Sequence, residues 1–273
     1  MNEPLLKVQN LSKRFSNKKA PIRALDDVSF EIYPGECLGI IGESGSGKST
    51  LARILMHLLT PSSGSIFFEG LDLLNLSRKE VKKLYQKMQM VFQDPYSSLN
   101  PRMTVSQILS EPLDIQAKLS DRDKKARIYE LLNLVRLSRT SLGRYPHEFS
   151  GGQRQRIGIA RALATNPIFL ICDEPVSALD VSVGAQIINL LKELKVELGL
   201  TYLFIGHDLN VVRYLSDRAL VLYQGKAVES GLIENLFTNP QDLYTKRLLN
   251  AAPSCDPTVQ KEKYRQLAKT GLL

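Results

Sequence analysis

The stretch GIIGESGSGKST, residues 39–50, decides the fold of this 273-residue chain. Residues 42–49 contain the pattern G-x-x-x-x-G-K-[ST]; the apolar run CLGII precedes them, and the helical pattern STLARILMHLL follows from residue 49. Glycines between a strand and a helix let successive backbone N–H groups point inward at a phosphate. We therefore predict a phosphate-binding loop here, in preference to a Gly/Ser-rich turn that contains a lysine by chance.

Two side chains of this loop have the chemistry of a nucleoside triphosphate site. Lys48 is expected to reach the β- and γ-phosphates as a point charge, and the hydroxyl of Ser49 is a ligand for Mg²⁺. The loop thus predicts ATP and Mg²⁺ as its ligands. The other loop residues expected to surround the phosphates are Gly42, Glu43, Ser44, Gly45, Ser46, Gly47 and Thr50.

The rest of the chain alternates strands and helices around this loop. Short strands separated by turns across residues 5–41 predict a small antiparallel sheet, and residues 104–144 are helical in period. Buried strands alternating with helices predict an α/β fold with a parallel-sheet core. Those strands are IFLICDE (168–174), YLFIGHD (202–208) and ALVLYQG (219–225). We expect one domain over residues 1–250, with a helical subdomain inserted at about 96–155, and a tail over 251–273.

Acidic and polar side chains follow three of the predicted strands. Parallel sheets bind ligands at the carboxyl ends of their strands. Asp173 is expected there as a Mg²⁺ ligand, and the neighbouring Glu174 as the group that polarises an attacking water. His207 is predicted to bond the γ-phosphate, while Gln93, after MQMVF, can ligate Mg²⁺ or position water. His57 is expected within the helix after the loop, in a structural role.

Composition narrows the function only slightly. The net charge of +8 allows binding to nucleic acid or to the anionic inner face of a membrane, but the basic clusters are short and are best explained as solvated surfaces. The longest apolar runs are strand-sized, and no signal peptide is expected. The three cysteines lack metal-ligand spacing and are expected to be reduced thiols.

A second pair of glycines stands directly before a helical pattern. In EFSGGQRQRIGIARALA, residues 148–164, the residues Ser-Gly-Gly open a helix, so free N–H groups and the positive end of the helix dipole can meet an anion. However, no apolar strand leads into it and no lysine follows the glycines. This segment therefore predicts a second phosphate contact of a different kind from the first.

The order of these motifs resembles the ATP-binding subunits of ABC transporters over residues 5 to about 250. GESGSGKST is similar to the Walker A loop, VFQDP to the Q-loop, SGGQ to the signature, FLICDE to Walker B, SALD to the D-loop and GHD to the H-loop. Several motifs in the family's order make a specific resemblance, which a lone phosphate loop would not. It implies a P-loop NTPase with a RecA-like core, an N-terminal antiparallel β subdomain and an inserted α-helical subdomain.

The resemblance also implies what the second glycine pair does. In this family two ATP-binding subunits pack head to tail, and the signature of one caps ATP held by the other. Ser150, Gly151, Gly152 and Gln153 are thereby expected to face a partner's γ-phosphate, and Asp180 to lie across the same interface. Phe15 stands where the family places an aromatic ring that stacks on adenine; ordinary strand packing is the alternative.

Longer segments are similar to the peptide and nickel importers of this family. These segments are MVFQDPYSSLNPRMTV (90–105), DEPVSALDVSVGAQIINLL (173–191) and YTKRLLNAAP (244–253). The resemblance implies an ATPase subunit peripheral to the cytoplasmic face of the membrane. Its partners would be a second ATP-binding subunit, two transmembrane permease subunits and an extracytoplasmic substrate-binding protein, with no nucleic acid. Peptide import is favoured over nickel or another chelated metal; an exporter ATPase, or an ABC ATPase acting on nucleic acid or ribosomes, is the remaining alternative.

Overall fold

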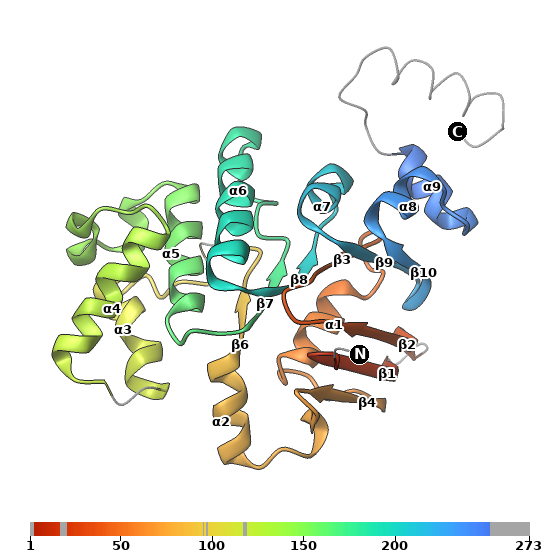
Figure 1. Ribbon diagram of the computed structural model, residues 1–273, viewed down its shortest axis with the longest axis horizontal. Helices are drawn as coiled ribbons and strands as arrows, with labels where there is room; N and C mark the ends of the chain where they lie inside the picture. The colour runs from red at the N-terminus through yellow and green to blue at the C-terminus, as the bar shows by residue number, and fades with distance from the viewer. Residues whose placement is uncertain (1–2, 17–20, 95, 97, 117–118, 252–273) are drawn as a thin grey trace.

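The computed structural model describes residues 3–16, 21–94, 96, 98–116 and 119–251, and Figure 1 shows how the elements are arranged. Among these residues the strands are β1 Leu6–Phe15, β2 Ile22–Ile32, β3 Cys37–Ile41, β4 Ser63–Phe68, β5 Leu71–Asp72, β6 Met88–Val91, β7 Phe169–Asp173, β8 Thr201–Ile205, β9 Arg218–Tyr223 and β10 Lys226–Leu232. The α-helices are α1 Lys48–Leu55, α2 Arg78–Lys87, α3 Val105–Gln116, α4 Asp121–Leu134, α5 Gly151–Leu163, α6 Val181–Leu198, α7 Leu209–Leu215, α8 Ile233–Thr238 and α9 Leu243–Ala251. Short 3₁₀ helices cover Leu73–Asn75, Arg139–Gly143 and Pro146–Glu148.

The described strands form two sheets. The larger has the order β10-β9-β3-β8-β7-β6, in which every pair is parallel except the antiparallel edge pair of β9 and β10. The smaller has the order β2-β1-β4-β5 and is antiparallel throughout. The predicted α/β architecture, with a parallel core and a small antiparallel sheet, is confirmed.

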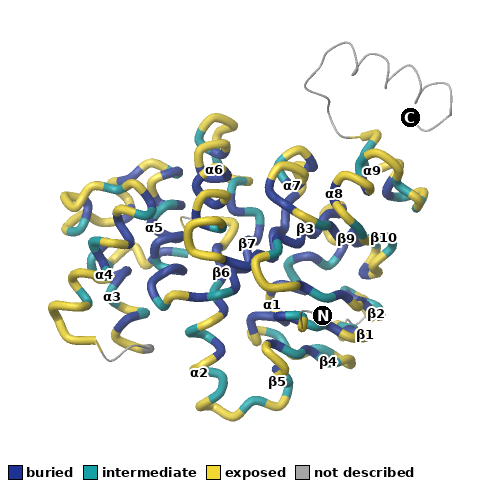
Figure 2. Tube along the Cα trace, viewed as in Figure 1, coloured by how far each residue is buried: buried dark blue, intermediate teal, exposed yellow. Residues whose placement is uncertain are grey.

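The five parallel strands of the larger sheet are mostly buried on both faces and mostly apolar, whereas no residue of the edge strand β10 is buried. Along β3, Leu38 and Ile40 pack toward the smaller sheet and α1, whereas Cys37 and Ile41 pack toward α5, α6 and α7. Every residue of β3 and β7 is buried, and Figure 2 shows the dark blue of the buried residues at the centre of the molecule. Because successive side chains of a strand point to opposite faces, the sheet lies between the two hydrophobic clusters and packs against both.

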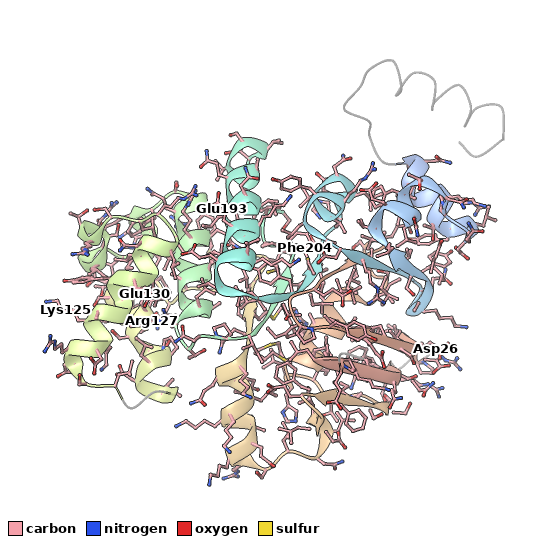
Figure 3. All side chains as sticks on the ribbon, in the orientation of Figure 1. Asp26, Lys125, Arg127, Glu130, Glu193 and Phe204 are labelled. Carbon is pink, nitrogen blue, oxygen red and sulfur yellow. The ribbon has the colours of Figure 1, made fainter. Side chains whose placement is uncertain are left out.

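Helices α3, α4 and α5 form a lobe on the left of Figure 1, beside the strand β6. Arg127 on α4 donates to the carbonyls of Leu163 (2.7 Å) and Ala164 (3.3 Å), which satisfies the C-terminal end of α5. Glu130, one turn along α4, lies 2.8 Å from the Arg127 guanidinium, and Figure 3 shows the two side chains together. The glycine-led helix α5 is thereby fixed within the lobe.

One detail of the helices differs from the sequence predictions. Helix α1 ends at Leu55, so His57 lies outside it, exposed and with φ 56°; the prediction that His57 lies within this helix is wrong. The carbonyls of Arg53 and Ile54 accept the N–H groups of Leu58 and His57, which closes the helix with a left-handed turn. Near the C-terminal end of the described chain, α8 and α9 pack on the core. Residues 252–273, which include Cys255 and nearly all of the predicted tail, lie outside the described residues.

No helix in the described part of the chain has both the length and the apolar character needed to cross a lipid bilayer.

Candidate functional site

The phosphate loop lies between β3 and α1, as predicted, and its shape depends on glycines. Gly42 has φ 154° and Gly47 has φ 110°. A Cβ at Gly42 would lie 2.2 Å from the carbonyl oxygen of Leu222, and one at Gly47 would lie 2.3 Å from that of Ala24. Because both neighbours are backbone atoms that cannot turn aside, these two positions require glycine.

Lys48 is buried at the first turn of α1, with its ammonium against the loop. Its Nζ donates to the carbonyl of Gly42 at 2.7 Å and to that of Glu43 at 2.8 Å. Burial lowers the pKa of Lys48, whereas the charges of Glu174, Asp173 and Glu43 act in the opposite direction. The loop therefore holds a cation beside backbone N–H groups that are available to phosphate oxygens.

A cavity of about 450 Å³ opens over this loop and collects residues from distant parts of the chain. It is lined by Ile22, Arg23, Ala24, Ser44, Gly45, Gly47, Lys48, Ser49, Thr50, Gln93, Glu174 and His207. Gln93, Glu174 and His207 therefore meet the phosphate loop as predicted. The volume lies in the range typical of small-ligand sites.

Asp173, at the carboxyl end of β7, faces Ser49 across the bottom of the site. The Ser49 hydroxyl donates to Asp173 Oδ1 at 3.3 Å, and Asp173 is 6% exposed. Burial raises the pKa of Asp173, while the hydrogen bond from Ser49 lowers it. A hydroxyl and a carboxylate are oxygen donors of the kind that Mg²⁺ prefers, so this pair fits the cation expected from the sequence.

Glu174 occupies a backbone conformation that side-chain-bearing residues seldom adopt, with φ 46°. Its N–H donates to the carbonyl of Ile205 at 2.9 Å, and its own carbonyl accepts from the Ser177 hydroxyl at 3.1 Å. The chain is thereby turned so that the carboxylate enters the cavity. There Glu174 Oε2 accepts from Gln93 Nε2 and contacts His207 Nδ1, both at 3.1 Å.

The signature residues lie at the start of α5 and are not among the residues that line this cavity. Ser150 caps the helix: its hydroxyl accepts from the N–H of Gln153, whose side chain accepts from the N–H of Ser150. A Cβ at Gly152 would lie 2.3 Å from Val183 Cγ1, and one at Gly151 would lie 3.0 Å from Leu179 Cδ2. Packing of α5 against Leu179, just before α6, and against Val183 in the first turn of α6 is therefore a second reason for these glycines, which sequence reasoning missed.

Phe15 and Asp180 do not line the cavity over the phosphate loop. Phe15 is 38% exposed and pairs with Ile22 at the end of the β1–β2 ladder; Ile22, not Phe15, lines the cavity. Asp180 is an exposed residue directly before α6. It lines a neighbouring cavity of about 570 Å³ that also reaches Glu174 and His207.

Sequence reasoning missed the contribution of β2 to the cavity. Ile22, Arg23 and Ala24 line it, and the Arg23 guanidinium lies 3.5 Å from a carboxylate oxygen of Asp26, which Figure 3 labels. These residues stand some twenty positions before the loop and form no motif with it. Only the packing of β2 over Gly47 brings them together, and no local pattern in the sequence encodes that contact.

Comparison with known proteins agrees with this geometry. Residues 25–177 match the family model described as ABC transporter. The chain is 51% identical over 268 residues to the oligopeptide transport ATP-binding protein OppF of Bacillus subtilis, covering 97% of this chain and 88% of that protein. It is 48% identical to OppF of Streptococcus mutans, covering 96% of this chain and 86% of that protein.

Two solved structures share the fold. The ATP-binding cassette MJ0796, in a dimeric post-hydrolysis state bound to ADP and Pi, has a TM-score of 0.76 at 33% identity; the match covers 84% of this chain and 98% of that one. CbiO1 of Clostridium perfringens, part of the transporter complex CbiONQ, has a TM-score of 0.77 at 30% identity, over 87% of this chain and 92% of that one. With a strand-loop-helix phosphate site and acidic residues at the end of β7, the chain belongs to the ABC transporter family, as one of its ATP-hydrolysing subunits.

Proposed function

We propose that this chain is the subunit that hydrolyses ATP to drive import of oligopeptides or dipeptides by an ABC transporter. The observation that carries the proposal is the likeness, over 97% of the chain, to an ATP-binding protein named for oligopeptide transport. The arrangement of the described site supports it.

The phosphate loop binds the triphosphate in this proposal. The backbone N–H groups of residues 44–50 and the Lys48 ammonium neutralise the β- and γ-phosphates, because a buried cation and a helix N-terminus both attract negative charge. The adenine ring lies toward β1 and β2, against Phe15 or Ile22. Arg23 closes the same side of the cavity.

Ser49 and Asp173 would hold Mg²⁺, with Gln93 as a further ligand or as a group that orients water. The fit rests on the facing oxygens of Ser49 and Asp173, 3.3 Å apart beside the loop. When bound, the cation neutralises charge on the β- and γ-phosphate oxygens.

Glu174 acts as the general base that orients and polarises the attacking water. Its carboxylate is held between Gln93 and His207, each 3.1 Å away, and its side chain is 17% exposed. His207, with a 63% exposed side chain, donates to the γ-phosphate as negative charge develops there. A positioned carboxylate of this kind contributes about 10²- to 10⁴-fold to the rate.

The signature serves ATP bound by a second ATP-binding subunit. Residues 150–153 are not among the residues that line the cavity of their own chain, and N–H groups at the start of α5 remain for an outside anion. Asp180 is exposed, as a residue at a head-to-tail interface must be in the separate chain. The dimeric state of MJ0796 supports this arrangement.

The membrane partners dock beside the segment that follows Gln93. A cavity of about 550 Å³ lies there between β6 and α3; Phe92, Glu111, Ile115 and Arg161 are among its lining residues. In this proposal it receives a short helix of a permease subunit. In the proposed complex the chain is peripheral to the cytoplasmic face of the membrane, beside two permease subunits that receive cargo from an extracytoplasmic binding protein. No nucleic acid takes part.

Growth and uptake in cells that lack this gene test the proposal. We expect such cells to lose growth on a short peptide as the sole source of a required amino acid, with nickel accumulation unchanged. The wild-type gene should restore growth and the Glu174→Gln variant should not. Unchanged peptide use with reduced nickel accumulation would reassign the cargo to a metal chelate. Co-purification with ribosomes or DNA in place of membrane proteins would contradict a transporter altogether.

A further inference from the structure

A tyrosine from near the end of the described chain reaches the phosphate loop. The backbone N–H of Glu43 donates to the hydroxyl oxygen of Tyr244 at 3.1 Å, although the two residues are 201 positions apart. The Tyr244 ring stacks on Tyr223 of β9, with ring centroids 4.0 Å apart and planes inclined by 29°. Because stacking on Tyr223 also fixes the ring, the hydrogen bond of Tyr244 to the loop is not a chance approach of an exposed side chain.

The start of α9 is fixed in place by two carboxylates. Asp242 Oδ1 accepts from the N–H groups of Tyr244 (2.7 Å) and Thr245 (3.3 Å). Glu229 of β10 accepts from the N–H groups of Gln241 (2.8 Å) and Asp242 (3.1 Å). Thr245 is fully buried. The residues before Tyr244 are thus bonded to the edge of the central sheet, and the ring has little freedom.

The peptide unit that Tyr244 contacts also holds the cation of the site. The carbonyls of Gly42 and Glu43 accept from Lys48 Nζ at 2.7 Å and 2.8 Å. On the other side of the loop, the N–H of Gly225 donates to the carbonyl of Ser46 at 3.0 Å. The loop is therefore supported at Glu43 by a side chain of α9 and at Ser46 by the turn between β9 and β10.

We propose that Tyr244 is a positioning residue for ATP binding: its hydroxyl holds the backbone at residues 42–43 in the shape that places Lys48, and it couples α9 to the nucleotide. The inference rests on the proposed role of the loop in binding nucleotide. Removing the hydroxyl leaves the Glu43 N–H without this acceptor, so the binding-competent loop becomes less populated. ADP and ATP should be affected alike, because both place phosphates in the same loop.

The test is Tyr244→Phe in the full-length chain, which keeps the ring and removes only the hydroxyl. We expect the Kd for ATP and for ADP to rise in parallel by about 3- to 10-fold, the effect of one hydrogen bond. The KM for ATP should rise by a similar factor while kcat stays within about twofold, because ground state and transition state lose the same contact. Tyr85→Phe is the matched control, since that half-buried hydroxyl donates to the Met56 carbonyl at 3.2 Å, away from the site.

Hydrogen exchange gives a readout that a purely structural role would not change. By linkage, a nucleotide stabilised by α9 must in turn stabilise α9. ADP should slow amide exchange in residues 243–251 of the wild-type chain and have much less effect in Tyr244→Phe. Equal nucleotide affinity in Tyr244→Phe and wild type, or no effect of ADP on α9 in the wild type, would overturn the proposal. A wild-type chain that binds no nucleotide would instead refute the assignment of the loop and remove the basis of this inference.

Discussion

Glu174 and His207 meet at the ends of adjacent strands, with Glu174 Oε2 3.1 Å from His207 Nδ1. The strands β7 and β8 are paired in parallel with Asp173 opposite Ile205, so Glu174, one residue beyond β7, and His207, two residues beyond β8, lie at the same edge of the sheet. Gln93, beyond the end of β6, completes the group from the other side. Gln93 and His207, more than a hundred positions apart in the sequence, thus contact the same carboxylate oxygen of Glu174.

Replacing Glu174 by Gln should preserve ATP binding and lower hydrolysis by about 10²- to 10⁴-fold, the usual contribution of a general base. The amide matches the shape of the carboxylate and can still bond Gln93, but it cannot polarise a water. Steady-state hydrolysis and nucleotide affinity measured on one preparation will separate the two effects. Turnover near the wild-type rate would show that Glu174 is not the base.

A methyl group at Gly152 should destabilise the fold. The added Cβ would lie 2.3 Å from Val183 Cγ1, so Gly152→Ala is expected to cost about 1–3 kcal/mol through overpacking. For a chain of this size each kcal/mol lowers Tm by roughly 2–4 °C. In a Val183→Ala background the same change should cost much less, which a double-mutant cycle by thermal unfolding can measure. Equal costs in the two backgrounds would mean that the Val183 contact does not explain the glycine.

Phe15 is predicted to stack on adenine, and the competing possibility is Ile22, which lines the cavity. If Phe15 stacks, Phe15→Ala should raise the Kd for ATP at least about fivefold, since stacking of a base on an aromatic side chain contributes about 1–3 kcal/mol. Phe15→Tyr should retain affinity. A loss of affinity in Ile22→Ala with none in Phe15→Ala would assign the adenine contact to Ile22.

The parts of this molecule that could be predicted from the sequence are those with short-range patterns. The loop at residues 42–49 lies between its strand and its helix because glycine spacing and apolar runs are local signals. Asp173, Glu174 and His207 were found because a strand end is visible in the sequence. The prediction is wrong at His57, because the apolar pattern of the helix continues through this residue in the sequence whereas the backbone turns there, with φ 56°.

Contacts made only in three dimensions could not be predicted in this way. Arg23 enters the cavity because β2 passes over Gly47, and Tyr244 reaches Glu43 across 201 residues. The sequence explains Gly152 only by approach to an anion, whereas its contact with Val183 depends on how α5 packs against the first turn of α6. Gly206 is similar: a Cβ there would lie 3.1 Å from both Phe204 and Val212, so tight packing favours glycine beside His207.

The last prediction concerns Gly151, the signature residue whose replacement the fold tolerates more easily. A Cβ there would lie 3.0 Å from Leu179 Cδ2, the end of a flexible side chain that can give way. Gly151→Asp should therefore leave the chain folded and able to bind ATP. The added carboxylate would face the γ-phosphate of a partner subunit, so hydrolysis by the assembled transporter should stop.

Mixing variants tests whether this defect acts between chains. In a homodimeric preparation, chains carrying Gly151→Asp are mixed with chains carrying Lys48→Ala, each variant being inactive alone. A mixed dimer contains one site with an intact phosphate loop from the first chain and an intact signature from the second, so partial hydrolysis should return. Lys48→Ala mixed with Glu174→Gln is a matched control: both changes lie in the loop half of the site, so neither composite site is whole and activity should stay absent. Loss of ATP binding by the separate Gly151→Asp chain would show that the signature serves its own nucleotide, because a residue that acts only across the interface cannot weaken binding before the interface forms.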